Sequence, residues 1–68
     1  MKIEDLVAGK SDSDSVQVES FSIPVSALKK LMDEGYENML PYKEEGTFSL
    51  WGKVSTACFT GQEMRDMA

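Results

Sequence analysis

Apolar and polar residues alternate along the segment VQVESFSI, residues 16–23, and the phase of the alternation changes midway. Val16 and Val18 alternate with polar residues, which is the period-two pattern of a half-buried strand. The next two apolar residues, Phe21 and Ile23, fall on the opposite face. We therefore predict a strand near residues 16–23 that either carries a bulge between the two pairs or is covered on both faces.

Residues 24–39 carry the spacing of an amphipathic helix. Pro24 suits the first turn, because its missing N–H would have no partner there in any case. The apolar residues that follow recur every three or four positions along one stripe: Val25, Leu28, Leu31, Met32, Tyr36, Met39 and Leu40. Pro41 then ends the pattern. Gly35 either caps the helix in a left-handed conformation or lies inside it at a cost of about 1 kcal/mol. We predict a helix that reaches Met39.

The segment TFSLWGKVSTACF, residues 47–59, fits two patterns. Read as a helix, it places its apolar residues on one face. Read as strands, its threonine, valine and aromatic residues have β preference, and Gly52-Lys53 would turn a hairpin. Because glycine, valine, serine and threonine are weak helix formers, the composition favours two strands, near 47–51 and 53–59.

Local signals also mark both ends of the chain. Thr60 and Glu63 have the spacing of a capping box, which predicts a short helix over residues 61–67. Near the other end, three apolar residues share one helical face: Ile3, Leu6 and Val7. We expect one or two helical turns there, or a frayed end.

These patterns predict one small α+β domain over residues 1–68. A short antiparallel sheet, with strands near 16–23, 47–51 and 53–59, packs against a central helix of about 24–39, followed by a short C-terminal helix over 61–67. Residues 9–15, GKSDSDS, are expected to form a flexible loop. A domain of this size buries only about 60% of its unfolded surface, so a second copy or another protein is expected to supply further core.

Charge and cysteine content narrow the functional classes. The formal net charge of −5 disfavours a nucleic-acid or anionic-membrane surface and suits a partner with a basic surface. No apolar run has the length of a membrane span or of a signal peptide. One cysteine cannot form an internal disulfide and fits a reducing compartment, so we expect a cytoplasmic protein.

The residue types that common catalytic and metal sites need are scarce in this chain. It has no histidine and only one cysteine, so neither a zinc site nor a nucleophile–histidine pair can be assembled. No glycine-rich phosphate-binding motif is present. The Asp12-x-Asp14 spacing begins like a calcium-binding loop, but Gln17 stands where that loop needs glycine. We therefore expect no enzyme, no cofactor and no metal.

Two sets of residues are candidates for a protein interface. The aromatic set is Tyr36, Phe48 and Trp51, because large aromatic residues are enriched at interface hot spots, although a lone tryptophan is also common in cores. The acidic set, which would form one negative surface, is Asp33, Glu34, Glu37, Glu44 and Glu45. Cys58 lies between Ala57 and Phe59 and is expected to be a small buried hydrophobe.

The function that we favour is a non-catalytic, acidic protein-binding module that regulates or inhibits a larger cytoplasmic protein, acting as a homodimer. Its physical basis is a charged surface combined with an exposed apolar patch. Short acidic chains without active-site residues are common among accessory proteins of phages and mobile elements. By that analogy, an anti-defence or DNA-mimicking role is included.

The alternative is a dimeric DNA-binding repressor or antitoxin. The order of strand and helix, Pro24 at the helix start, and Gly46-Thr47 before a second helix resemble a ribbon-helix-helix protein over residues 16–59. That resemblance implies a dimer whose strands read DNA bases. The strand here has no lysine or arginine to contact base edges, and the net charge has the same sign as DNA.

Overall fold

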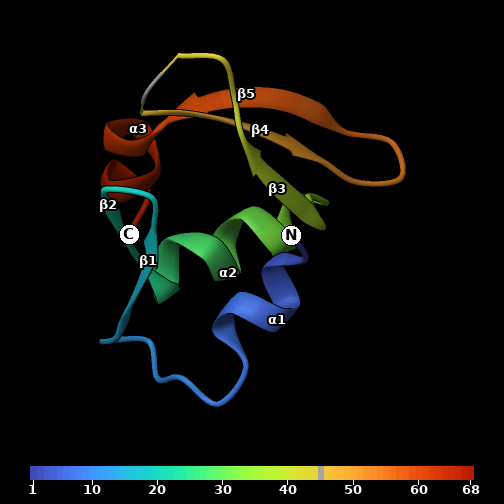
Figure 1. The fold of residues 1–68 in the computed structure, drawn as a ribbon. Helices are drawn as coiled ribbons and strands as arrows, with labels where there is room; N and C mark the ends of the chain where they lie inside the picture. Colours follow the sequence, from blue (N-terminus) through green and yellow to red (C-terminus); the bar gives the residue numbers. More distant parts are fainter. Residues whose placement is uncertain (45) are drawn as a thin grey trace.

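Short helices and antiparallel strands alternate in the computed structural model, which describes residues 1–44 and 46–68 (Figure 1). In chain order the elements are α1 (Ile3–Val7), β1 (Ser15–Val18), β2 (Phe21–Pro24), α2 (Val25–Asp33), β3 (Asn38–Pro41), β4 (Thr47–Trp51), β5 (Thr56–Thr60) and α3 (Gly61–Asp66). The strands form a two-stranded sheet, β1-β2, and a three-stranded sheet in the order β3-β4-β5. The predicted class, a small single-domain α+β fold, is confirmed.

The predicted strand over residues 16–23 is instead a hairpin of two strands. β1 pairs antiparallel with β2, so that Val16 lies opposite Ile23 and Val18 lies opposite Phe21. The chain reverses at Glu19, whose φ of 54° is in the left-handed region. The change of phase in the sequence therefore marks a tight turn and not a bulge.

The central helix is shorter than predicted, because it ends at Asp33 and not at Met39. Gly35 has a φ of 103°, and the Tyr36 N–H donates to the Leu31 carbonyl at 3.1 Å while the Gly35 N–H donates to the Met32 carbonyl at 3.0 Å. These bonds form a Schellman cap, in which a glycine adopts the left-handed conformation just past the last turn.

The residues after this cap form a strand that the sequence analysis missed. β3 carries Met39 and pairs antiparallel with β4, which brings Met39 opposite Leu50 in the core. The first residues of the chain cover the other edge of β3: Lys2 forms a β-bridge with Asn38, and the Ile3 N–H donates to the Glu37 carbonyl at 3.0 Å.

The segment 47–59 forms strands, as its composition favoured. β4 occupies residues 47–51 as predicted, whereas the following strand begins later than expected, at Thr56. The hairpin turns at Lys53 and Val54, closed by the Gly52 N–H, which donates to the Ser55 carbonyl at 2.8 Å. A side chain at Gly52 would overlap the carbonyl oxygen of Gly35, so this turn packs directly against the cap of α2.

The capping box of the C-terminal helix is confirmed. The Glu63 N–H donates to the Thr60 hydroxyl at 3.0 Å, and the Thr60 N–H donates to the Glu63 carboxylate at 2.9 Å. The helix then ends at Asp66. A short N-terminal helix, α1, is also present, with Ile3 and Val7 buried.

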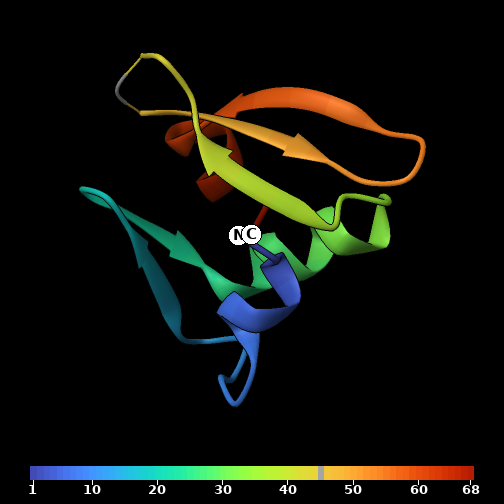
Figure 2. The same ribbon diagram turned by 45° about the vertical axis from the view of Figure 1, so that its right-hand side comes forward.

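The core lies between the three-stranded sheet and the helices α2 and α3 (Figure 2). The largest side chains that are fully buried there are Phe48, Ile3, Ile23, Leu28, Leu31, Met39, Leu50, Met64 and Val25. No polar or charged side chain of the described residues is buried. The loop between α1 and β1 lies outside this core, and Lys29 of α2 forms an ion pair with its Asp12.

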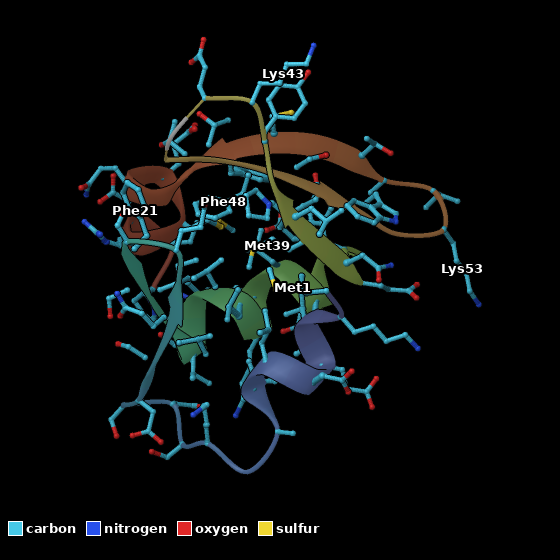
Figure 3. The ribbon with its side chains drawn as sticks, viewed as in Figure 1. Met1, Phe21, Met39, Lys43, Phe48 and Lys53 are labelled. Carbon is cyan, nitrogen blue, oxygen red and sulfur yellow. The ribbon has the colours of Figure 1, made fainter. Side chains whose placement is uncertain are left out.

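Phe21 joins the β1-β2 hairpin to the rest of the fold (Figure 3). Its ring meets Phe48 edge to face, with 6.0 Å between centroids and an interplanar angle of 89°. The ring also packs on the bare backbones of Gly46 and Gly61, where an added Cβ would come within 2.8 Å and 2.5 Å of ring atoms. The guanidinium carbon of Arg65 lies 5.4 Å from the ring centroid, in cation–π range.

We expect Phe21→Ala to lower the free energy of unfolding by about 2–4 kcal/mol, because it empties this contact. Gly61→Ala should cost about 1–3 kcal/mol by overpacking against the ring. In the double variant the glycine change should cost much less, because the ring is gone. Urea denaturation measures all three free energies.

Tyr42→Ala, which removes an exposed aromatic side chain, is the control and should change stability by less than about 0.5 kcal/mol. A Gly61→Ala cost that is the same with and without Phe21 would show that the glycine does not accommodate the ring.

Candidate protein-binding surface

The three-stranded sheet has one face on the core and one face open to solvent. Along β4, Phe48 and Leu50 are buried, so Thr47, Ser49 and Trp51 project to the opposite side. Residues that lie opposite each other on neighbouring strands share a face of the sheet. The Tyr42 N–H donates to the Thr47 carbonyl at 2.9 Å, which extends the β3–β4 pairing by one residue and places Tyr42 on the same face as Thr47. We call the exposed side the outer face; its residues are Asn38, Leu40, Tyr42, Thr47, Ser49, Trp51, Thr56, Cys58 and Thr60.

The register orders the outer face into three rows that cross the strands. One row holds Asn38, Trp51 and Thr56, and the central row holds Leu40, Ser49 and Cys58. The third row holds Tyr42, Thr47 and Thr60. Figures 1 and 2 show α2 and α3 on the other side of the sheet, so neither helix covers these rows.

No residue of the outer face carries a charge, although 28% of the residues in the chain are charged. Leu40 is 45% exposed and Tyr42 is 51% exposed, while Trp51 is half-buried between them and the β4–β5 turn. The solvated face of an antiparallel sheet is usually polar, and depletion of charge around aromatic residues is typical of the centre of a protein interface. The outer face therefore has the composition of a binding surface.

The structure distributes the three predicted aromatic residues over different environments. Trp51 lies on the outer face. Tyr36 lies below the sheet, half-buried, with its ring edge to face with Phe59 at 5.6 Å between centroids. Phe48 is fully buried in the core, so its side chain offers no surface to a partner and is removed from the candidate set.

The predicted acidic residues lie at the two ends of β3. Asp33 and Glu34 are exposed at the end of α2, and Glu37 is exposed just before β3. Glu44 is exposed beyond the other end of this strand, and Glu45 lies outside the described residues. Four strand residues span about 14 Å, so Glu37 and Glu44 flank the outer face and do not adjoin each other.

A hollow of about 140 Å³ lies where the N-terminal segment, the end of α2 and the start of β3 meet, lined by Lys2, Glu4, Met32, Tyr36, Glu37 and Asn38. Pockets that hold drug-sized ligands have volumes of about 300–1,000 Å³. Within residues 1–44 and 46–68, no three His, Cys, Asp or Glu side chains are grouped so that they could hold a metal ion. The geometry therefore favours a surface contact over enclosure of a small molecule.

Of the nine residues on the outer face, only Trp51 was a candidate from the sequence. Leu40 was assigned to the helical stripe and Cys58 to the core, whereas both are exposed. A usable signal was present: Lys53 is the only charged residue between Thr47 and Thr60, in a chain that is otherwise rich in charge.

Comparisons with protein-family models, with curated proteins and with solved structures return no match for this chain. In the part of the chain that the structure describes, no helix combines the length and apolar character needed to cross a bilayer. The fold and the outer face define a small α+β protein whose three-stranded sheet has one uncovered face among the described residues.

We expect Cys58 to react fully with a thiol reagent such as Ellman's reagent in native buffer, because its side chain is exposed on the outer face. The reaction is followed by absorbance with dilute protein, and the same measurement in denaturant gives the reference rate. A thiol that reacts only after denaturant is added would show that Cys58 is buried.

Proposed function

We propose that this protein is a non-catalytic binding module that docks on a larger protein through the outer face of the sheet. The observation that carries the proposal is the exposed, uncharged surface around Leu40, Tyr42 and Trp51 in a strongly acidic chain. Leaving such residues in water has no structural benefit, whereas burying them against a partner is favourable by about 25 cal/mol for each Å² of apolar surface.

The charges around the outer face indicate the chemistry of the partner. Glu37 and Glu44 stand at its two ends, and Lys43 offsets only part of this charge. A partner that presents an apolar patch bordered by basic residues would match both the centre and the rim. Opposite charges at the rim mainly speed association and select the partner, while the apolar centre supplies affinity.

The remaining features support the same class of function. The residues on the outer face are threonine, serine, asparagine and apolar side chains, with no general acid or base among them. The single thiol fits a reducing compartment, so we place the module in the cytoplasm, where it would regulate or inhibit its partner. The ribbon-helix-helix alternative requires a second helix in residues 47–59, where the chain forms β4 and β5.

We expect Leu40→Glu to abolish capture of the partner from a lysate of the host cell, because it places a charge in the centre of the apolar surface. Gln17→Glu is the matched control: it adds the same charge at an exposed strand position on β1, away from the outer face, and should leave capture unchanged. Both variants should unfold at the temperature of the wild type, because both sites are exposed.

The captured protein, once purified, should change the emission of Trp51 when it is titrated into the wild-type protein, since Trp51 is the only tryptophan of this chain and lies on the outer face. Equal capture by the wild type and by Leu40→Glu would overturn the proposal, and so would an unchanged hydrogen-exchange rate in β3 and β4 when the purified partner is bound.

A further inference from the structure

β5 is an edge strand whose free side is open. It pairs with β4 alone, while β3 forms the other edge of the sheet and is covered there by residues 1–3. The Gly52 N–H donates to the Ser55 carbonyl, which fixes the alternation of hydrogen bonds along the β4–β5 hairpin. In an antiparallel pair this alternation directs the backbone groups of Thr56 and Cys58 away from β4, toward the free edge.

This edge lacks the features with which proteins usually prevent strand pairing. Its sequence, TACFT, contains no charged residue and no proline. Exposed edges in monomers are commonly blocked by lysine, proline, a bulge or a covering segment. The nearest charged residues along the chain are Lys53 at one end of β5 and Glu63 at the other. The edge is therefore ready to accept another strand.

We propose that the free edge of β5 pairs antiparallel with β5 of a second copy of this chain, forming a dimer with one continuous sheet of six strands. This inference rests on the backbone groups at the edge of the sheet, whereas the docking function above rests on side chains of the outer face. Two copies with a net charge of −5 each repel one another, so association is least opposed where no carboxylates meet. The uncharged strand β5 provides such a place.

Charge complementarity selects the second copy and the direction of the pairing. Antiparallel pairing about a two-fold axis places the Lys53 end of each copy beside the Glu63 end of the other, whereas parallel pairing would bring like charges together. Cys58 is the middle residue of β5, so an axis through Cys58 sets Cys58 opposite the second copy's Cys58 and Thr56 opposite its Thr60. The Thr60 N–H already donates to the Glu63 carboxylate, so it takes no part in the pairing. The N–H of each Thr56 then reaches the Thr60 carbonyl of the other copy.

The dimer is tested by sedimentation velocity over a wide range of protein concentration. The expected mass rises from 7.6 kDa to twice that value, 15.2 kDa, as concentration increases. Cys58→Lys should raise the dimer dissociation constant by about tenfold or more, because it sets two like charges directly opposite each other. Ser49→Lys is the matched control: it adds the same charge to the same row of the outer face, on the central strand, and should change the constant little.

A second measurement uses the native chain and does not depend on a variant that folds. A short bismaleimide should link Cys58 to the second copy's Cys58 in high yield at concentrations where the dimer forms. Ser49→Cys in a Cys58→Ser background should give little linked product, because the central strands of the two copies are separated by both edge strands. A mass of 7.6 kDa at every concentration, or a dimer unaffected by Cys58→Lys and not linked through Cys58, would overturn the inference.

The two proposals fail separately. Leu40→Glu changes the outer face away from the β5 edge, so it should abolish partner capture and leave the dimer mass unchanged. Because Cys58 also lies on the outer face, Cys58→Lys is assayed for dimer mass and not for capture. Loss of capture in Leu40→Glu with the dimer mass retained would support pairing through β5 as a separate property. A monomeric wild type that still captures its partner would overturn only the dimer.

Discussion

The fold depends on the packing of Phe21 against two bare stretches of backbone. The β1-β2 hairpin contains only short strands, and an isolated hairpin is marginally stable in water. The ring of Phe21 fixes this hairpin to the larger sheet, because it packs against Phe48 and against the backbones of Gly46 and Gly61. These two glycines are joined to each other by a hydrogen bond, in which the Gly61 N–H donates to the Gly46 carbonyl at 2.8 Å. Arg65 reinforces the contact, because its Nε also donates to the Ser22 carbonyl at 3.2 Å. One aromatic side chain thus couples β2, the β4 strand and the start of α3.

This contact also explains why one face of the larger sheet remains open. The hairpin, α2 and α3 pack together on the side of Phe48 and Leu50, and in residues 1–44 and 46–68 no helix or strand lies over the other side. Residues 1–3 are used to cover the edge of β3. The outer face and the β5 edge are therefore the two parts of this sheet that the described elements leave uncovered.

The sequence predicted those elements whose signals are local. The Thr60–Glu63 capping box specifies a helix start through its own hydrogen bonds, and the β preference of residues 47–51 was sufficient to place β4. Met39 was misassigned because its spacing from Tyr36 fits a helix, while its true position depends on pairing with Leu50, a contact that is distant in sequence.

The β1-β2 hairpin was missed because its turn lacks the usual glycine or asparagine and uses Glu19 in the left-handed region. For the candidate interface residues, position along the chain did not show which face of the sheet each side chain occupies. The buried Phe48 and the half-buried Trp51 of the same strand therefore looked equivalent until the strand pairing was known.

The acidic residues and the uncharged parts of the surface have different effects on association between copies of this chain. An open strand edge attracts any other strand through backbone hydrogen bonds that carry no sequence information, so an unguarded edge would promote aggregation. Net negative charge on every copy opposes such contacts in most orientations. The orientation that remains favourable is the one in which the Lys53 and Glu63 ends of β5 alternate. In the proposed dimer the backbone supplies the attraction and the distribution of charge supplies the specificity, because carboxylates are absent from β5 and present on other parts of the surface.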